Sequence, residues 1–157
     1  MSDVGQNERA TQNRIVKLIS KKLGYKYLGD FQDRTNNQNI EKEILKKWLL
    51  GRGISEALYT KIERQIEQSI ALGGGRKLYE ANKEFYSLLR YGVKDKENPN
   101  DKNETVWLID WKNIDNNEFA IAEEVTIKGQ NTKRPDIVLY VNGIALAVLE
   151  LKRSSVG

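Results

Sequence analysis

The sequence contains no cysteine and no histidine among its 157 residues. Disulfides and thiolate metal sites are therefore excluded, as are zinc sites ligated by histidine and catalytic groups built on Ser-His or Cys-His pairs. Hydrolytic chemistry would have to rely on carboxylates, lysine, tyrosine or serine, together with a hard, oxygen-binding cation such as magnesium. Candidate site residues must therefore be sought among the acids and lysines.

Long uninterrupted apolar runs are also absent, and the N-terminus is polar without a signal-peptide pattern. We therefore expect a soluble, cytoplasmic protein with no membrane partner. The length suits about one domain with a real hydrophobic core. The 26 Lys and Arg against 22 Asp and Glu give a formal net charge of +4, which permits a polyanionic partner without requiring one.

The first half of the chain has the hydrophobic spacing of helices. Apolar residues recur along one helical face in four segments, each of which a glycine ends. The expected helices cover residues 7–23, 39–50 with Asn39 as N-cap, a segment from the N-cap Ser55 to the glycines at 73–75, and 77–89. The glycine triplet lacks the preceding strand and the following Gly-Lys-Ser/Thr of a phosphate-binding loop, so it is interpreted as a flexible connector.

After the polar loop at 94–103, the spacing of the apolar residues changes from that of helices to that of strands. The expected strands cover residues 104–111, 118–127, 137–141 and 144–149. Helices first and strands afterwards indicate an α+β fold with a mainly antiparallel four-stranded sheet, flanked by about four helices. In one domain of residues 1–157, the helical part would span 1–93 and the sheet part 104–157. Tyr25 to Leu28 are interpreted as a short extended connection.

Asn142-Gly143 separates the last two strands and is the dipeptide that most favours a two-residue hairpin turn. Glu150 and Lys152 follow the second strand and point to the same side, because side chains alternate along an extended chain. Burying them and Asp136 beside aliphatic residues would cost several kcal/mol unless they paired or held a metal. The open end of the hairpin is therefore a candidate site.

The last strand is apolar on both faces, which is typical of a central strand covered on each side. With a perfect two-residue turn, counting back along the ladder places Asp136 on the face away from Glu150. The two carboxylates could not then share an ion. We therefore expect a bulge, or an irregular start after Pro135, that rotates Asp136 toward Glu150.

Three other features have a structural and a functional interpretation. Glu8 lies about two turns before Ile15 on the apolar side of the first helix, where it either contributes to a site or simply suits the helix dipole. Trp107, Trp111 and the seven tyrosines are expected to pack in the core or at its rim rather than to stack on nucleic-acid bases. Asp110-Trp111-Lys112 repeats the acid-x-lysine spacing, but we expect no site there.

The ordered set of short motifs resembles one known family. The motifs are Asn7-Glu8-Arg9, Leu23-Gly24-Tyr25, Leu108-Ile109-Asp110-Trp111, Arg134-Pro135-Asp136-Ile137-Val138, Val141-Asn142-Gly143-Ile144 and Leu149-Glu150-Leu151-Lys152. Together they are similar to the amino-terminal nuclease domain of the R (restriction) subunit of type I restriction-modification enzymes, within the PD-(D/E)xK nuclease superfamily. The resemblance covers nearly the whole chain and implies a restriction-endonuclease-like core.

The resemblance also implies roles for individual residues. The ligands of one or two Mg²⁺ ions, which Mn²⁺ could replace, would be Asp136, Glu150, the Leu151 carbonyl and Glu8. Lys152 would position or deprotonate the attacking water and stabilise the developing charge. Arg134 and Lys133 suit contacts with DNA phosphates, although solvated charges explain them equally well. A structural ion pair between Glu150 and Lys152 is the alternative to a metal site.

Some elements of the family fall outside these residues. The chain ends five residues after Lys152, before the family's helix with a Gln-x-x-x-Tyr motif and the strand that follows it, and it lacks the phosphate-binding motif of the ATP-driven motor. We therefore expect an amino-terminal fragment, with a truncated nuclease core, that does not cut DNA efficiently alone. In the full-length protein the resemblance implies magnesium-dependent cleavage of double-stranded DNA coupled to ATP-driven translocation. Methyltransferase and specificity subunits would be its partners, and the specificity subunit would supply the recognition sequence.

Two other functions remain open. The chain could belong to a stand-alone PD-(D/E)xK nuclease of repair or recombination. It could also be a catalytically inactive domain that docks a helicase-like motor onto partner subunits or DNA. A metal bridging Asp136 and Glu150 would favour an enzyme, whereas a direct ion pair of Lys152 with Glu150 and no metal would favour the docking domain.

Overall fold

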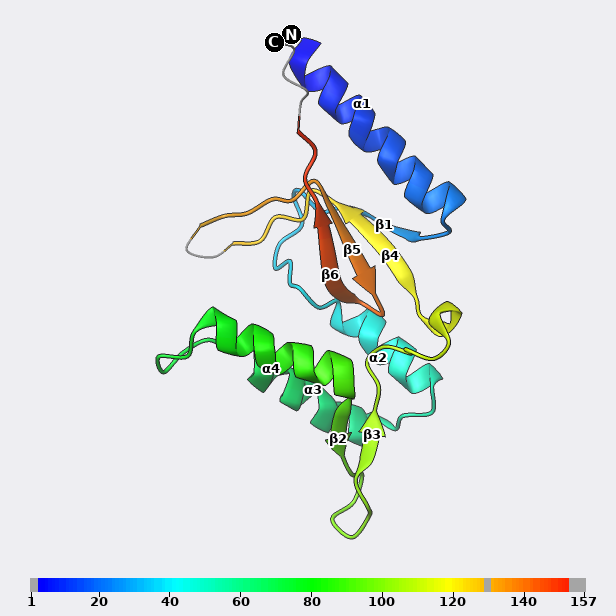
Figure 1. The fold of residues 1–157 in the computed structure, drawn as a ribbon, viewed down its shortest axis with the longest axis vertical. Coiled ribbons are helices and arrows are strands. Elements are labelled where there is room, and N and C mark those ends of the chain that lie inside the picture. The colour runs from blue at the N-terminus through cyan, green and yellow to red at the C-terminus, as the bar shows by residue number, and fades with distance from the viewer. Residues whose placement is uncertain (1–2, 129–130, 153–157) are drawn as a thin grey trace. The chain divides into compact units, whose positions relative to one another are not determined.

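A computed structural model describes residues 3–128 and 131–152. The chain divides into two compact units, which are treated separately below. Residues 1–41 and 118–157 form the sheet unit, and residues 42–117 form the helical unit. Figure 1 labels the elements of both units. Among the described helices, none combines the length and the apolar character that a membrane crossing needs.

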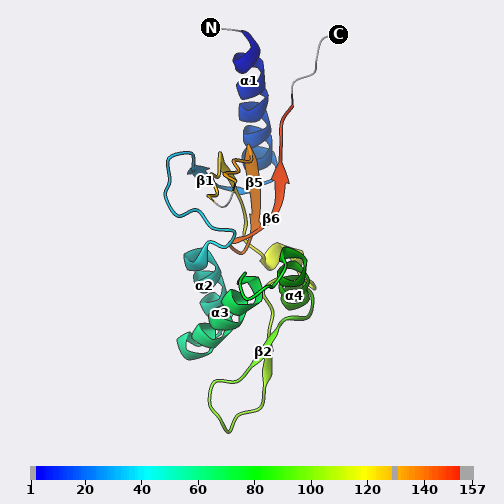
Figure 2. The same ribbon diagram turned by 90° about the vertical axis from the view of Figure 1, so that its left-hand side faces the viewer.

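The sheet unit contains one long helix and four strands. Helix α1, Asp3–Lys17, continues directly into the π-helical turn η1, Leu18–Lys22. The strands are β1, Lys26–Asp30; β4, Phe119–Glu123; β5, Ile137–Val141; and β6, Ile144–Leu149. Their order is β1-β4-β5-β6, with β1 parallel to β4 and the other neighbours antiparallel. The sheet is therefore mixed, and Figure 2 gives a second view of it.

The α+β class and the four helices agree with the prediction, but the expected membership of the sheet is wrong. Strand β1 takes the place in the sheet that was expected for residues 104–111. Its residues were interpreted as a mere connection because a parallel partner far away in sequence leaves no local hairpin signal. The parallel pairing of β1 with β4 is also what makes the sheet mixed rather than antiparallel throughout.

Both faces of the sheet carry apolar side chains, because successive residues of β4 point to opposite sides. Ala120 and Ala122 pack with Tyr140 in one buried cluster. Ile121 packs on the other side with Ile19 of η1, where apolar residues from the end of α1 also join. This second cluster fixes α1 against the sheet and so determines which of its polar residues reach the strand ends.

The predicted bulge is present, but in the middle of the hairpin rather than after Pro135. The pairs are Val141–Ile144 and Tyr140–Ala145 beside the turn, then Leu139–Ala147, Val138–Val148 and Ile137–Leu149. Leu146 is the extra residue. Because it shifts the register by one, Ile137 faces Leu149, and the chain positions that come next are Asp136 and Glu150.

Strand β6 lies at an edge of the sheet, so the prediction of a central strand is wrong. Its apolar side chains Leu146 and Val148 are 44% and 57% exposed. An apolar pattern on both faces indicates burial only when other elements cover both faces, and a sequence pattern does not report that.

The helical unit contains three helices and a small antiparallel ribbon. Its elements are α2, Lys42–Gly51; α3, Glu56–Ile70; α4, Leu78–Tyr91; β2, Val93–Asp95; β3, Glu104–Val106; and the 3-10 turn η2, Ile114–Asn116. Ser55 caps α3 as predicted, since its Oγ accepts from the Leu58 N–H at 3.2 Å. Asn39 does not cap α2, since α2 begins only at Lys42; Asn39 and Ile40 belong to the sheet unit, within which Ile40 forms a β-bridge with Ile144.

Candidate active site

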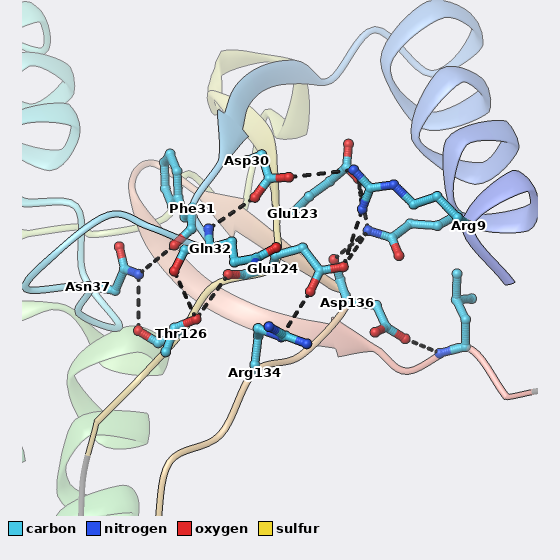
Figure 3. A network of polar contacts seen from close by, with 12 residues as sticks. Arg9, Asp30, Phe31, Gln32, Asn37, Glu123, Glu124, Thr126, Arg134 and Asp136 are labelled. Atoms are coloured by element: carbon cyan, nitrogen blue, oxygen red, sulfur yellow. Dashed lines mark hydrogen bonds and ion pairs between the residues drawn. The ribbon is translucent and has the colours of Figure 1, made fainter. Parts of the chain in front are cut away.

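Five acidic residues lie at one end of the sheet, where strands β1, β4 and β6 terminate and β5 begins. The register defines this end: Asp30 is paired with Glu123, Glu123 is opposite Ile137, and Ile137 is opposite Leu149. The five residues, called the acidic edge below, are Asp30, Glu123, Glu124, Asp136 and Glu150. Figure 3 shows the network that joins several of them to Arg9 of α1.

Asp136 stands immediately before β5, and Glu150 immediately after β6. The register shift at Leu146 pairs Ile137 with Leu149, so Asp136 and Glu150 are the residues that flank the last pair of this ladder. The Asp136 carboxylate also accepts a hydrogen bond from the backbone N–H of Leu151 at 2.5 Å. The start of β5 is therefore tied to the segment that carries Glu150 and Lys152.

Glu123 is the most deeply buried acid of the acidic edge, with 5% of its surface exposed. Its two oxygens accept from the Tyr27 hydroxyl at 2.9 Å and from the Gln12 side-chain amide at 2.8 Å. Arg9 adds an ion pair at 3.7 Å. Burial, and then the hydrogen bond to Glu123, raise the pKa of Tyr27 to about 12, so this phenol stays a donor at neutral pH. These donors compensate the burial of the carboxylate.

Glu124 holds the chain around Asp136 from the neighbouring strand. Its backbone is left-handed, with φ of 51°, an uncommon conformation for a residue other than glycine. This turn lets its N–H donate to the Asp136 carbonyl at 3.0 Å. Its carboxylate meanwhile pairs with Arg134 at 3.1 Å and with Arg9 at 3.4 Å, and accepts from the Gln12 amide at 3.1 Å (Figure 3). Glu124 thus restrains Asp136 through its backbone and through Arg134.

Three other predicted site residues, the ligands Glu8 and Glu150 and the catalytic Lys152, have accessible side chains. Glu8, Glu150 and Lys152 are exposed, and within residues 3–128 and 131–152 none of them forms a hydrogen bond or ion pair. The alternative ion pair between Glu150 and Lys152 is thus not formed there. No three acidic side chains of those same residues lie close enough together to hold a metal ion as they stand.

The two predicted DNA-contacting residues differ in their surroundings. The Arg134 guanidinium is about half exposed and pairs with Glu124, so part of its charge is compensated inside the protein. Lys133 is exposed, and its backbone forms a bridge with Ile127. Contact of either side chain with DNA stays a prediction.

Sequence reasoning missed most of the network around Asp136. The residues it overlooked are Arg9, Gln12, Tyr27, Glu123 and Glu124. One signal could have revealed Glu123, because it directly follows the apolar run 119–122, as Glu150 follows the apolar run 144–149. Gln12 also lies three and seven residues before Ile15 and Ile19, which places it on the packed face of the helix. Tyr27 carried no such signal, since its strand was not predicted.

The second acid-x-lysine segment lies in the helical unit and is structural. Asp110 is buried, and its carboxylate accepts from Arg52 at 2.9 Å, from Asn116 at 2.9 Å and from two backbone N–H groups. The Asn116 hydrogen bond and those backbone hydrogen bonds, aided by Arg52, lower the pKa of Asp110 to about 2. Its lone pairs are engaged, which agrees with the expectation that this acid-x-lysine spacing marks no metal-dependent nuclease site.

Comparison with known proteins identifies the family. The family model described as the type I restriction enzyme R protein N terminus matches residues 5–157. The chain belongs to this family. A putative type I restriction enzyme endonuclease subunit of Methanocaldococcus jannaschii, MjaIXP, is 29% identical over 152 residues, which are 90% of this chain and 14% of that protein. A second such subunit from the same organism, MjaVIIIP, is 31% identical over 137 residues, or 84% of this chain and 13% of its own length.

A shorter match extends the same result to a bacterium. The HindI endonuclease subunit of Haemophilus influenzae is 39% identical over 75 residues, covering 45% of this chain and 7% of that protein. This member of the R protein family therefore spans about one seventh of the length of the curated relatives that it matches over most of its residues. No solved structure matches the chain.

Proposed function

We propose that this chain forms the nuclease region of a type I restriction R subunit and hydrolyses phosphodiester bonds of double-stranded DNA with magnesium. One observation carries the proposal: Asp136 and Glu150 flank the last pair of the β5–β6 ladder, and the Asp136 carboxylate accepts a hydrogen bond from the N–H of Leu151, the residue between Glu150 and Lys152. The names of the relatives, which are endonuclease subunits, support the same reaction class. The sheet unit would then be a restriction-endonuclease-like core.

The donor set suits magnesium. Mg²⁺ prefers oxygen ligands and is commonly held by one or two carboxylates, with waters and substrate phosphates completing its shell. Asp136 and Glu150 would supply these carboxylates, and the Leu151 carbonyl belongs to the same segment. Glu8 would be a further ligand, since it lies one helical turn before Gln12, whose amide already contacts the acidic edge.

The residues of the chain would divide the work as follows. When bound, magnesium would polarise the scissile phosphate and lower the pKa of an attacking water. Lys152 would hold or deprotonate that water and stabilise the negative charge that develops on the phosphate. Glu124 and Gln12 would keep Asp136 in place through its carbonyl. Arg134 and Lys133 would contact the DNA backbone beside the acidic edge.

In the longer protein, cleavage would be coupled to ATP-driven translocation and to methyltransferase and specificity subunits. These partners, and the location in the cytoplasm, are part of the proposal because the chain spans only a small share of its relatives. The catalytically inactive docking domain is the second candidate. The observation that favours it is that no group of three acids among the described residues could hold a metal as it stands.

The experiment compares single variants in the full-length R subunit assembled with its partners. Lys152→Ala and Asp136→Ala should each lower DNA cleavage by at least about a hundredfold while ATP hydrolysis continues, because general acid-base and metal contributions are of that order. Asp33→Ala, which removes an exposed acid of the same unit, is the matched control. Cleavage at the unaltered rate in both test variants would leave the docking domain as the better account.

A further inference from the structure

The helical unit contains a cavity of about 470 Å³ that the proposed nuclease reaction does not use. It lies where α4 ends and where the chain continues after β3. Six of its lining residues are large aromatic or basic, and they define what is called the aromatic-basic cavity below: Tyr91, Trp107, Trp111, Arg52, Arg90 and Lys112. A volume of this size is within the range of small-molecule and nucleotide sites.

The three aromatic residues of the cavity are exposed. Tyr91 is 65% exposed, Trp107 48% and Trp111 47%. The sequence favoured positions in the core or at its rim for both tryptophans, and about half of each is exposed at the surface. Within the described residues, neither Tyr91 nor Trp107 makes a contact with another aromatic ring or with a cation above its ring. Aromatic surface of this extent around one cavity is typical of a binding site.

The Trp111 indole ring is held in position by a hydrogen bond, and the Trp107 ring lies beside Gly92. The Trp111 Nε1 donates to the Leu89 carbonyl at 2.9 Å, which ties the ring to the end of α4. Trp107 lies against Gly92, where an added Cβ would come within 3.6 Å of the ring and 2.5 Å of Thr105. Gly92 also has φ of 76°, so a larger residue would be strained there. A ring that is fixed before binding loses little entropy when a ligand stacks on it.

The charges around these rings are mostly positive. Arg52 is paired with Asp110 at 2.9 Å, and this acid is the one carboxylate of the lining. The Arg90 guanidinium lies 5.5 Å from the centre of the Trp111 ring. Lys112 is exposed and forms no ion pair with any described side chain. Two cations therefore remain uncompensated beside three aromatic rings.

We propose that the aromatic-basic cavity binds single-stranded nucleic acid, with a base stacked on its exposed rings and the adjoining phosphates beside Arg90 and Lys112. Planar aromatic platforms in a positive groove are the usual means of holding single strands without reading their sequence. A duplex fits less well, because its bases are already stacked on one another. A protein partner could use the same aromatic and arginine side chains, but Lys112 favours a ligand that carries phosphates, since lysine is depleted in protein interfaces.

This site goes beyond the proposed nuclease function, because it lies in the other unit and needs no metal. The test titrates the chain with a short oligothymidylate in the presence of a chelator and follows tryptophan fluorescence. Binding should quench the emission. A strand of equal length and charge that lacks bases should bind more weakly by about 5- to 150-fold, the range of one base stacked on an aromatic side chain.

Variants assign the binding to the cavity. Trp107→Leu and Tyr91→Leu should each weaken the oligothymidylate affinity by a similar factor, measured by anisotropy of a labelled strand. Tyr86→Leu is the matched control, because Tyr86 lies on the same helix as Tyr91, is 63% exposed and does not line the cavity. Lys112→Gln should lower the slope of affinity against salt by about one phosphate contact. Circular dichroism verifies that each variant is folded.

Three results would overturn the assignment. The first is equal affinity for the base-free strand, which would mean that phosphates alone are bound. The second is an equal loss of affinity in Tyr86→Leu. The third is the absence of quenching together with self-association that Trp107→Leu abolishes, which would assign the cavity to a second copy of the chain. A failure of metal binding at the acidic edge would leave this assignment untouched.

Discussion

Two acid-x-lysine segments of this chain have the same spacing and opposite surroundings. Asp110 is buried, and four donors occupy its carboxylate. Glu150 is exposed, and its carboxylate has no hydrogen bond or ion pair within the part of the chain that the structure describes. The first segment stabilises a loop of the helical unit, whereas the second follows an edge strand beside Asp136.

The difference teaches that spacing alone does not identify a metal-binding carboxylate. A ligand needs free lone pairs on its oxygens, and those of Asp110 are already engaged by the protein. Asp136 and Glu123 lie between these two cases. Each carboxylate accepts a hydrogen bond from the protein, from the Leu151 N–H and the Gln12 amide respectively, and each belongs to the group of five acids. A catalytic site requires both kinds of residue: some that remain free to bind and others that position them.

Among the substitutions proposed, replacement of Asp110 should destabilise the fold most. Asp110→Ala removes the acceptor of four hydrogen bonds, so Arg52 and two backbone N–H groups lose their buried partner. We expect the lowest urea midpoint of all the variants discussed here. Asp115→Ala removes an exposed acid of the same unit and is the control. Equal midpoints for the two variants would show that the Asp110 network contributes nothing.

The Asp110 carboxylate should also make the stability of the fold depend on pH in the acidic range. The pKa of Asp110 is about 2 in the folded chain, against about 3.9 for an unperturbed aspartate. Because the folded pKa is depressed, the stabilisation is complete above about pH 4 and is lost as the pH falls toward 2. Urea midpoints measured across this range should fall more steeply for the unaltered chain than for Asp110→Asn. Parallel curves would contradict the assignment.

A smaller loss of stability is expected when the hydrogen bonds that Gln12 donates around Asp136 are removed. Gln12 is 3% exposed, and its amide donates to Glu123 and Glu124 and to the Asp136 carbonyl. Gln12→Ala leaves these groups with one donor fewer and should cost about 1–3 kcal/mol of unfolding free energy. Asn13→Ala, at an exposed position of the same helix, should cost less. Denaturant unfolding of both variants decides whether the network stabilises the fold.

The smallest effect should come from Glu150. Since its side chain is exposed and forms no polar contact with the described residues, Glu150→Ala should change the unfolding free energy by less than about 0.5 kcal/mol. Asp110→Ala, which replaces the acid of the other acid-x-lysine segment, should lower the unfolding free energy much more. A large destabilisation by Glu150→Ala would mean that this carboxylate has a structural partner after all.

The helices could be predicted well because their signals are local. Ser55 and the glycines that end the helices lie within a few residues of the apolar segments they bound. The structure has helices at all four predicted places. Strand β1 could not be recognised, because its stability depends on parallel pairing with β4, which is far away in sequence. The edge position of β6 was missed for a related reason, since an apolar pattern does not tell which neighbours a strand has.

The candidate site was predictable in part. Asp136 and Glu150 were proposed from the motif, and their role as ligands stays a prediction. The conflict in their register required a bulge, which the structure places at Leu146. The bulge position was not predictable, because the flanking apolar residues are alike and either strand could accommodate the extra one. Arg9 and Tyr27 were missed, since their roles depend on how α1 and β1 pack against the end of β4.

Magnesium binding to this chain tests the central claim most directly. Calorimetric titration with Mg²⁺ or Mn²⁺ is compared between the unaltered chain, Asp136→Ala and the control Asp115→Ala. We predict that Asp136→Ala weakens the metal affinity by at least about tenfold, because even residues that only support a ligand commonly contribute this much. Asp115→Ala should bind like the unaltered chain. Equal affinity in Asp136→Ala would contradict the assignment of the metal site to the acidic edge.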